Sequence, residues 1–85
     1  MNKTTWTSTA WNDYLFWQKS DKQKLKRINE LIKATLRDPF NGIGNPEALK
    51  HDLQGFWSRR IDSEHRLVYT IQNQALLIIA CRYHY

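Results

Sequence analysis

Apolar residues recur at three- and four-residue intervals through the first half of the chain, and this spacing predicts two helices. The first is expected from about residue 9 to residue 19, after an N-cap at Ser8. Its apolar stripe contains Trp11, Tyr14 and Leu15. The second is expected to run to about Arg37, with Ser20 or Asp21 as its N-cap. Its stripe contains Leu25, Ile28, Leu31, Ile32 and Leu36. Pro39 has no amide hydrogen, so this helix should end before it.

The second half of the chain alternates apolar runs with tight turns, which predicts antiparallel strands. Three strands are expected at residues 56–62, 65–72 and 75–82, joined by turns at 63–64 and 73–74. A short strand is expected at 3–7, and another within 47–53 is left open. Residues 75–81 are apolar at every position, so that strand should lie inside the sheet with both faces buried.

This order of elements predicts an α+β fold, in which a small antiparallel β-sheet packs against two N-terminal α-helices. The 85 residues are enough for one small domain, so residues 1–85 are expected to form a single domain. Four Trp, four Tyr and three Phe supply large buried areas for so short a chain. The one cysteine, Cys81, has no partner for an intramolecular disulfide and lies in an apolar run, which favours a buried thiol.

Charge and hydropathy indicate which kind of partner and which cellular compartment to expect. Thirteen Lys and Arg against eight Asp and Glu give a net charge of +5, which favours contact with a polyanion such as RNA. Much of this charge lies on the second helix, whose Lys and Arg residues either follow a phosphate backbone or are simply solvated. Neither a membrane span nor a signal peptide is recognisable, so a cytoplasmic protein without membrane contact is expected.

The second half is rich in groups suited to phosphate chemistry. These are Glu47, Lys50, His51, Arg59, Arg60, His65, Arg66, Arg82, His84 and Tyr85. Cleavage of RNA by its own 2′-hydroxyl needs a base, an acid for the departing 5′-oxygen, and cations around the phosphorus. Glu47 or a histidine suits the first role, His84 the second and the arginines the third.

Residue types alone do not assign these roles. His51 and His65 are expected at the surface, and paired strand arginines are more often solvated than catalytic. A register shift of one residue would turn Arg66 to the other face of the sheet. Three scattered histidines and one cysteine lack the spacing of a zinc site, so no metal or cofactor is expected.

Several blocks of the sequence together resemble toxins of the Txe/YoeB family, within the wider group of RelE- and ParE-like toxins. They are residues 46–51 (PEALKH), 55–61 (GFWSRRI), 64–69 (EHRLVY) and 80–85 (ACRYHY), with 11–14 (WNDY) and 28–33 (INELIK) in the helices. The resemblance implies the RelE/ParE-like toxin fold, in agreement with the pattern of elements.

It also implies a function: the toxin of a type II toxin–antitoxin pair, an endoribonuclease that cuts messenger RNA in the A site of the 70S ribosome without a metal. By resemblance, Glu47 is the general base, Arg66 stabilises the transition state, His84 is the general acid, and Tyr85 lies against the nucleotide. The supporting phosphate contacts would be Lys50, Arg60 and Arg82. Implied partners are a YefM-type antitoxin and a second copy of the chain.

Two other classes of function remain open from the residues alone. ParE-like relatives poison an enzyme such as gyrase by binding it, but generally lack a catalytic set of this kind. A basic RNA-binding module would need the lysine face of the second helix and would tolerate loss of residues 83–85.

Overall fold

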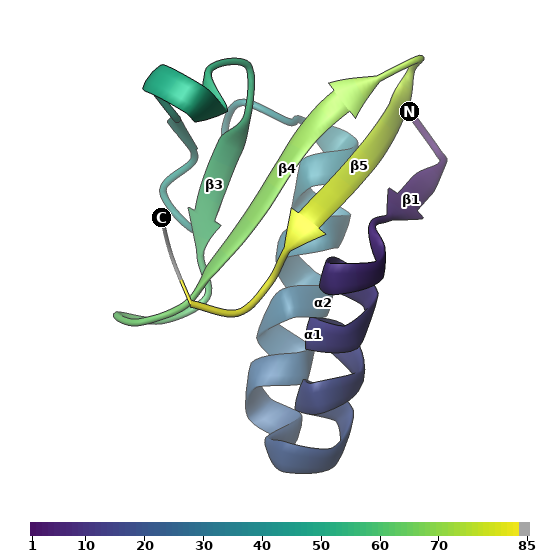
Figure 1. Ribbon diagram of the computed structural model, residues 1–85, viewed down its shortest axis with the longest axis vertical. Coiled ribbons are helices and arrows are strands. Elements are labelled where there is room, and N and C mark those ends of the chain that lie inside the picture. Colours follow the sequence, from purple (N-terminus) through teal and green to yellow (C-terminus); the bar gives the residue numbers. More distant parts are fainter. Residues whose placement is uncertain (84–85) are drawn as a thin grey trace.

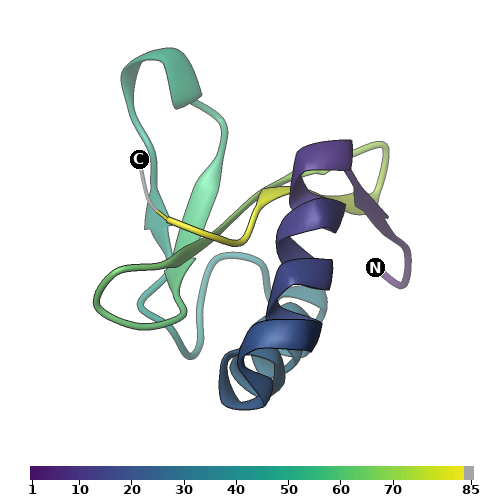
Figure 2. The same ribbon diagram turned by 60° about the horizontal axis from the view of Figure 1, so that its bottom comes forward.

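The computed structural model describes residues 1–83, which form two α-helices, one 3₁₀ helix and five strands (Figure 1). The elements follow in the order β1 (Thr4–Trp6), α1 (Ser8–Ser20), α2 (Lys22–Arg37), β2 (Glu47–Ala48), η1 (His51–Leu53), β3 (Trp57–Arg60), β4 (Arg66–Gln72) and β5 (Ala75–Ala80). The two helices lie side by side on one face of the sheet, as Figure 2 also shows from a second direction. Within the described residues, neither helix is long and apolar enough to cross a bilayer.

The helix boundaries follow from capping groups. The Thr7 hydroxyl accepts a hydrogen bond from the N–H of Ala10 at 3.1 Å, so Thr7 is the N-cap of α1 and the predicted cap, Ser8, is its first helical residue. Asp21 separates the helices: its N–H donates to Trp17 O at 3.0 Å, and its carboxylate accepts from the N–H groups of residues 23 and 24. Of the two predicted caps for α2, Asp21 is therefore the correct one.

The sheet has the strand order β1-β5-β4-β3-β2, and every neighbouring pair is antiparallel except β1 with β5. The predicted arrangement of a small sheet on two helices is confirmed. The parallel pairing of β1 with β5 was not predicted, because the local pattern did not indicate which strand would lie beside the strand at 3–7. Strand β5 lies between β1 and β4, as predicted for an apolar run, but Leu77 and Ile79 are only partly buried, so the prediction of two buried faces was too strong.

The core lies between the helices and the sheet. Ile28 and Leu31 of α2 pack with Leu67, Leu76 and Ile78 of the sheet, and all five side chains are fully buried. The predicted α2 stripe thus faces the sheet, and the lysine-rich side of α2 faces solvent. The opposite face of the sheet has no helix on it, and we call it the open face (Figure 1).

Candidate functional site

Strand register places three of the predicted site residues on the open face. Glu47 on β2 pairs with Ser58 on β3, and two residues further along β3 Arg60 pairs with Arg66 on β4. Side chains alternate between faces along a strand, so Glu47, Ser58, Arg60 and Arg66 share one face. With neighbouring strands about 4.8 Å apart and a rise of about 3.4 Å per residue, the Cα atoms of Glu47 and Arg66 are roughly 12 Å apart. Two long side chains can therefore reach one phosphate–ribose unit from opposite sides.

Arg60 and Arg66 stand directly opposite each other, an arrangement that disfavours folding unless an anion compensates it. The ion pairs within residues 1–83 are Lys24 with Asp62 and His65 with Glu64, so neither arginine has a carboxylate partner there. Arg60 is exposed, whereas Arg66 is half-buried and its Nη1 donates to Asp62 O at 3.0 Å. Two guanidinium groups on one face, of which that of Arg66 is held by backbone carbonyls, are suited to binding a phosphate.

The segment after β5, residues 81–83, runs toward the arginine pair, and it is the yellow coil that leaves β5 in Figure 1. The N–H of Arg66 donates to Tyr83 O at 2.8 Å, which brings Tyr83 beside the start of β4. The Arg82 guanidinium lies 3.6 Å from the centroid of the Phe16 ring and 4.7 Å from that of Tyr83. His84 and Tyr85 lie outside the described residues. The structure therefore brings together Arg60, Arg66 and residue 83.

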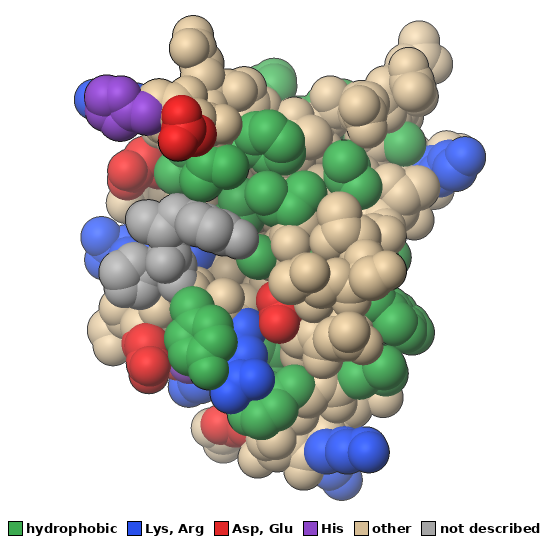
Figure 3. All heavy atoms as spheres, viewed as in Figure 1, with side chains coloured by type: hydrophobic (Ala, Val, Ile, Leu, Met, Phe, Trp, Pro, Cys, Tyr) green, Lys and Arg blue, Asp and Glu red, His purple; other side chains and the backbone are tan. Residues whose placement is uncertain are grey.

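The other predicted positions are more peripheral. Lys50 is exposed and is the N-cap residue of η1, two residues beyond β2. Figure 3 views the molecule from the side of the open face and shows basic, acidic and hydrophobic side chains interspersed on it. The open face is therefore not a uniform basic surface, and the arginine pair is a local feature.

The sequence places Arg59 among the candidates for phosphate binding, but in the folded protein its role is structural. Its side chain is fully buried, with Nε donating to the Tyr69 hydroxyl at 3.1 Å. Nη1 donates to Ile43 O at 2.9 Å, and Nη2 donates to Asp38 O at 2.6 Å and to Asn41 O at 2.9 Å. Arg59 thus holds the loop between α2 and β2. The sequence did contain a signal for this, because positions 57, 59 and 61 share a face and the flanking two are apolar.

His65 was expected at the surface, and this prediction is wrong. Only 7% of it is exposed, its ring meets Trp17 edge-on at 4.8 Å, and its Nδ1 accepts a hydrogen bond from the N–H of Tyr83 at 2.7 Å. The turn that precedes β4 holds it there, since the Asp62 carboxylate accepts from the N–H of His65 at 2.7 Å. His51 is exposed, as expected.

Two ionisable groups near the segment 81–83 have shifted pKa values. Burial raises the pKa of the Cys81 thiol to about 12, helped by the nearby Asp13 carboxylate, so Cys81 is no nucleophile at neutral pH. Burial also raises the pKa of Asp13, against the lowering effect of the hydrogen bond from Cys81 N–H and of the charge on Arg82. Among residues 1–83, no three His, Cys, Asp or Glu side chains gather in a way that could hold a metal ion.

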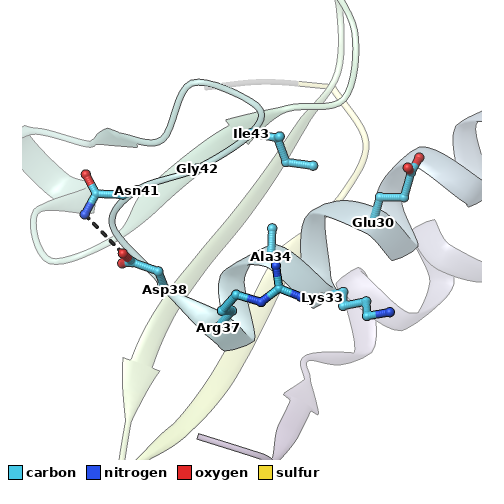
Figure 4. Close-up of a pocket in the computed structure, with 8 residues that line it drawn as sticks. All are labelled: Glu30, Lys33, Ala34, Arg37, Asp38, Asn41, Gly42 and Ile43. Carbon is cyan, nitrogen blue, oxygen red and sulfur yellow. Dashed lines mark hydrogen bonds between the residues drawn. The ribbon is translucent and has the colours of Figure 1, made fainter.

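A groove of about 500 Å³ lies between α2 and the loop that follows it. Figure 4 shows Lys33 and Arg37 on the α2 side and Asn41, Gly42 and Ile43 on the loop side. None of the predicted site residues lines it, so it is separate from the open-face site.

Residues 6–85 match the family described as the YoeB-like toxin of a bacterial type II toxin–antitoxin system. The chain is 61% identical over 83 residues to Toxin YoeB of Escherichia coli K12, covering 98% of this chain and 99% of that protein. It superposes on the YoeB/ParE toxin from Agrobacterium tumefaciens with a TM-score of 0.96 at 49% identity, over 98% of this chain and 99% of that one.

Two structures from Staphylococcus aureus, a YoeB dimer and a heterotetrameric YoeB–YefM toxin–antitoxin complex, each match with a TM-score of 0.90 at 46% identity. Each match covers 98% of this chain and 97% of the other.

Proposed function

Because this chain belongs to the family of YoeB-like toxins of bacterial type II toxin–antitoxin systems, we propose that it is a ribosome-dependent endoribonuclease that cuts messenger RNA in the ribosomal A site. Residues 1–85 would act as one toxin domain in the cytoplasm. The observation that carries the proposal is the opposed pair Arg60 and Arg66, which shares the open face with Glu47 and has no carboxylate partner among the described residues.

The reaction is an attack of a ribose 2′-hydroxyl on the adjacent phosphorus. Glu47 accepts the 2′-hydroxyl proton as the new O–P bond forms, and Arg66 stabilises the negative charge that builds up on the phosphate oxygens. The bond from phosphorus to the 5′-oxygen then breaks, and His84 donates a proton to that oxygen. The products are a 2′,3′-cyclic phosphate and a 5′-hydroxyl end, and no metal or cofactor takes part.

The remaining predicted residues orient the substrate. Lys50 and Arg60 contact phosphate groups on either side of the reacting one, and Tyr85 lies against a nucleotide base. Arg82 would contact a phosphate through its N–H edges, which its stacking on the Phe16 ring leaves available.

The decisive test is to map cut sites by primer extension on messenger RNA in programmed 70S ribosomes. His84→Gln and Arg66→Gln should each abolish cleavage while ribosome binding and thermal stability stay close to wild type. Lys19→Gln, which removes one exposed charge from α1, is the matched control and should cut normally. Wild-type cleavage by His84→Gln would refute the acid assignment. A transition-metal chelator, at a Mg²⁺ level that keeps ribosomes intact, should not slow the reaction.

The same experiment separates the proposal from the other two functional classes, because neither a gyrase-type poison nor an RNA-binding module cuts the messenger. A variant with a stop codon in place of Tyr83 should lose cleavage completely if the proposal is right. An RNA-binding module would inhibit translation equally with or without residues 83–85 and would leave the messenger uncut.

We also propose a YefM-type antitoxin and a second copy of the chain as partners, by analogy with the Staphylococcus assemblies. An exposed aromatic cluster supports an interface: Trp11 is 44% exposed and stacks on Tyr14, with Trp6 packed against both. Sedimentation of wild type and of Trp11→Ala tests the second copy. A wild-type monomer at micromolar concentration would contradict the dimer.

A further inference from the structure

We propose that Asp13, Trp17 and His65 form a clamp on the backbone of residues 81–83 that positions the next two residues, His84 and Tyr85, for the reaction. We call these three side chains the tail clamp. The inference rests on the proposed function, which gives His84 and Tyr85 their roles, and it assigns to the tail clamp a positioning role rather than direct contact with RNA.

The clamp begins where strand pairing ends. The β5 strand ends at Ala80. Beyond it, side chains make many of the backbone hydrogen bonds that a neighbouring strand would otherwise make. The N–H of Cys81 donates to Asp13 Oδ2 at 3.0 Å, and the indole Nε1–H of Trp17 donates to Cys81 O at 2.8 Å. The backbone N–H and the carbonyl of Cys81 are therefore both held by side chains of α1, the helix that packs against β5.

The second half of the clamp holds Tyr83. Its N–H donates to His65 Nδ1 at 2.7 Å, and its carbonyl accepts from the N–H of Arg66 at 2.8 Å. Tyr83 has a φ of +64°, in the left-handed region that a bulky residue adopts only when its surroundings hold it there. Tyr83 is 54% exposed, so burial of its own side chain does not account for this conformation. The two backbone hydrogen bonds hold Tyr83 in this conformation, and residue 84 follows it directly in the chain.

His65 is itself rigidly placed. Its N–H donates to Asp62 Oδ1, and its ring packs edge-on against Trp17, which is only 5% exposed. Because Nδ1 accepts the N–H of Tyr83, the neutral imidazole carries its proton on Nε2, which lies 3.5 Å from the Glu64 carboxylate. The Trp17 side chain thus connects the two halves of the clamp, because its ring packs against His65 and its N–H donates to Cys81 O.

A positioning role and a purely structural role predict different kinetics. A misplacement of about 1 Å in a catalytic group can cost about a hundredfold in rate without weakening substrate binding. Loss of a purely structural contact lowers thermal stability but leaves the reaction of the folded protein unchanged. The maximal rate constant, measured separately from the half-saturating concentration, therefore separates the two.

The experiment compares two substitutions of His65 in single-turnover cleavage of messenger RNA on programmed 70S ribosomes. His65→Phe keeps an aromatic ring against Trp17 but removes the acceptor. His65→Asn keeps an oxygen acceptor close to the position of Nδ1. We expect the maximal rate constant of His65→Phe to fall about 10- to 100-fold, with the half-saturating toxin concentration changed less than about twofold. His65→Asn should recover to within about threefold of wild type.

The matched control is Thr35→Val, which also removes one side-chain hydrogen bond at a buried position, in that case from the Thr35 hydroxyl to Leu31 O at 2.7 Å. It does not touch residues 81–83 and should cleave at the wild-type rate. A second readout needs no activity: hydrogen exchange of the Tyr83 amide, measured by NMR, should speed up in His65→Phe and not in Thr35→Val.

The outcomes separate this inference from the proposed function. Absence of cleavage by the wild-type protein would refute the proposed function, and the clamp's positioning role with it. Wild-type cleavage together with an unchanged rate in His65→Phe would overturn the clamp alone. If His65→Phe does not fold, Trp17→Phe decides, because it removes the N–H that binds Cys81 O and keeps a smaller aromatic ring at this buried position. A wild-type rate in Trp17→Phe would then overturn the inference.

Discussion

Arg59 and Arg60 are neighbours on β3, yet they face opposite sides of the sheet, and this allows a sharp prediction. Replacing Arg59 with Met keeps much of the aliphatic stem but removes all four hydrogen bonds of the buried guanidinium. Replacing Arg60 with Met removes an exposed charge from the open face. The two variants have the same composition and differ only in which side of the strand loses its arginine.

The magnitude follows from the contacts of Arg59. Hydrogen bonds to charged groups contribute about 1.5–3 kcal/mol each, but the guanidinium also loses its hydration on burial, and the freed loop carbonyls can regain water. We therefore expect a net loss of about 3 kcal/mol in the free energy of unfolding for Arg59→Met. With an unfolding entropy of about 2.1 cal/mol/K per residue, this lowers the melting temperature by roughly 17 °C. Arg60→Met should change the unfolding free energy by less than about 0.5 kcal/mol.

The assay is urea unfolding followed by tryptophan fluorescence, with messenger cleavage measured on the same samples. Arg59→Met should be strongly destabilised, and its folded fraction should still cut RNA. Arg60→Met should be stable and cut poorly. Equal stability of the two variants would refute the assignment of Arg59 as the residue that holds the loop between α2 and β2.

Three further predictions concern other parts of the molecule. Gly44 and Gly55 both have positive φ, but an added Cβ at Gly44 would lie 2.7 Å from a core leucine, whereas at Gly55 it meets nothing within 4 Å. Chemical denaturation should therefore show a loss of about 1 kcal/mol for Gly55→Ala and about 2–3 kcal/mol for Gly44→Ala, and equal losses would contradict the close packing. The Cys81 thiol, with a pKa of about 12, should react with a thiol reagent at pH 8 only after unfolding, and rapid labelling of the native protein would show that it is accessible. Burial tends to raise the pKa of Asp62, but hydrogen bonds from Lys24 and from two backbone N–H groups outweigh it and lower that pKa from 3.8 to about 2. Because the pKa of Asp62 is lower in the folded protein than its ordinary value, the ionised carboxylate stabilises the fold above about pH 4. This stabilisation is lost as the pH falls toward 2. Because both side chains of the pair remain partly exposed, wild type should exceed Asp62→Asn by only about 1 kcal/mol at pH 5, and this difference should vanish near pH 2.

The sequence by itself determined the elements and the fold class. The two helices follow from apolar spacing and from a cap at Asp21, and the β4–β5 hairpin follows from two apolar runs around the turn at 73–74. These signals are local, because helix periodicity, capping and turn preferences each involve residues only a few positions apart. Resemblance of short blocks then identified the family.

Tertiary structure decided which chemical groups meet. The opposition of Arg60 and Arg66 is a matter of strand register, in which a shift of one residue would turn Arg66 toward the core. The burial of Arg59 and of His65 depends on partners 10 to 21 positions away, namely Tyr69, Asp38 and Tyr83. Local sequence patterns carry no record of such distant pairings. The same amino-acid types that looked interchangeable along the chain, two adjacent arginines above all, therefore acquired different roles only when the sheet assigned each of them a side.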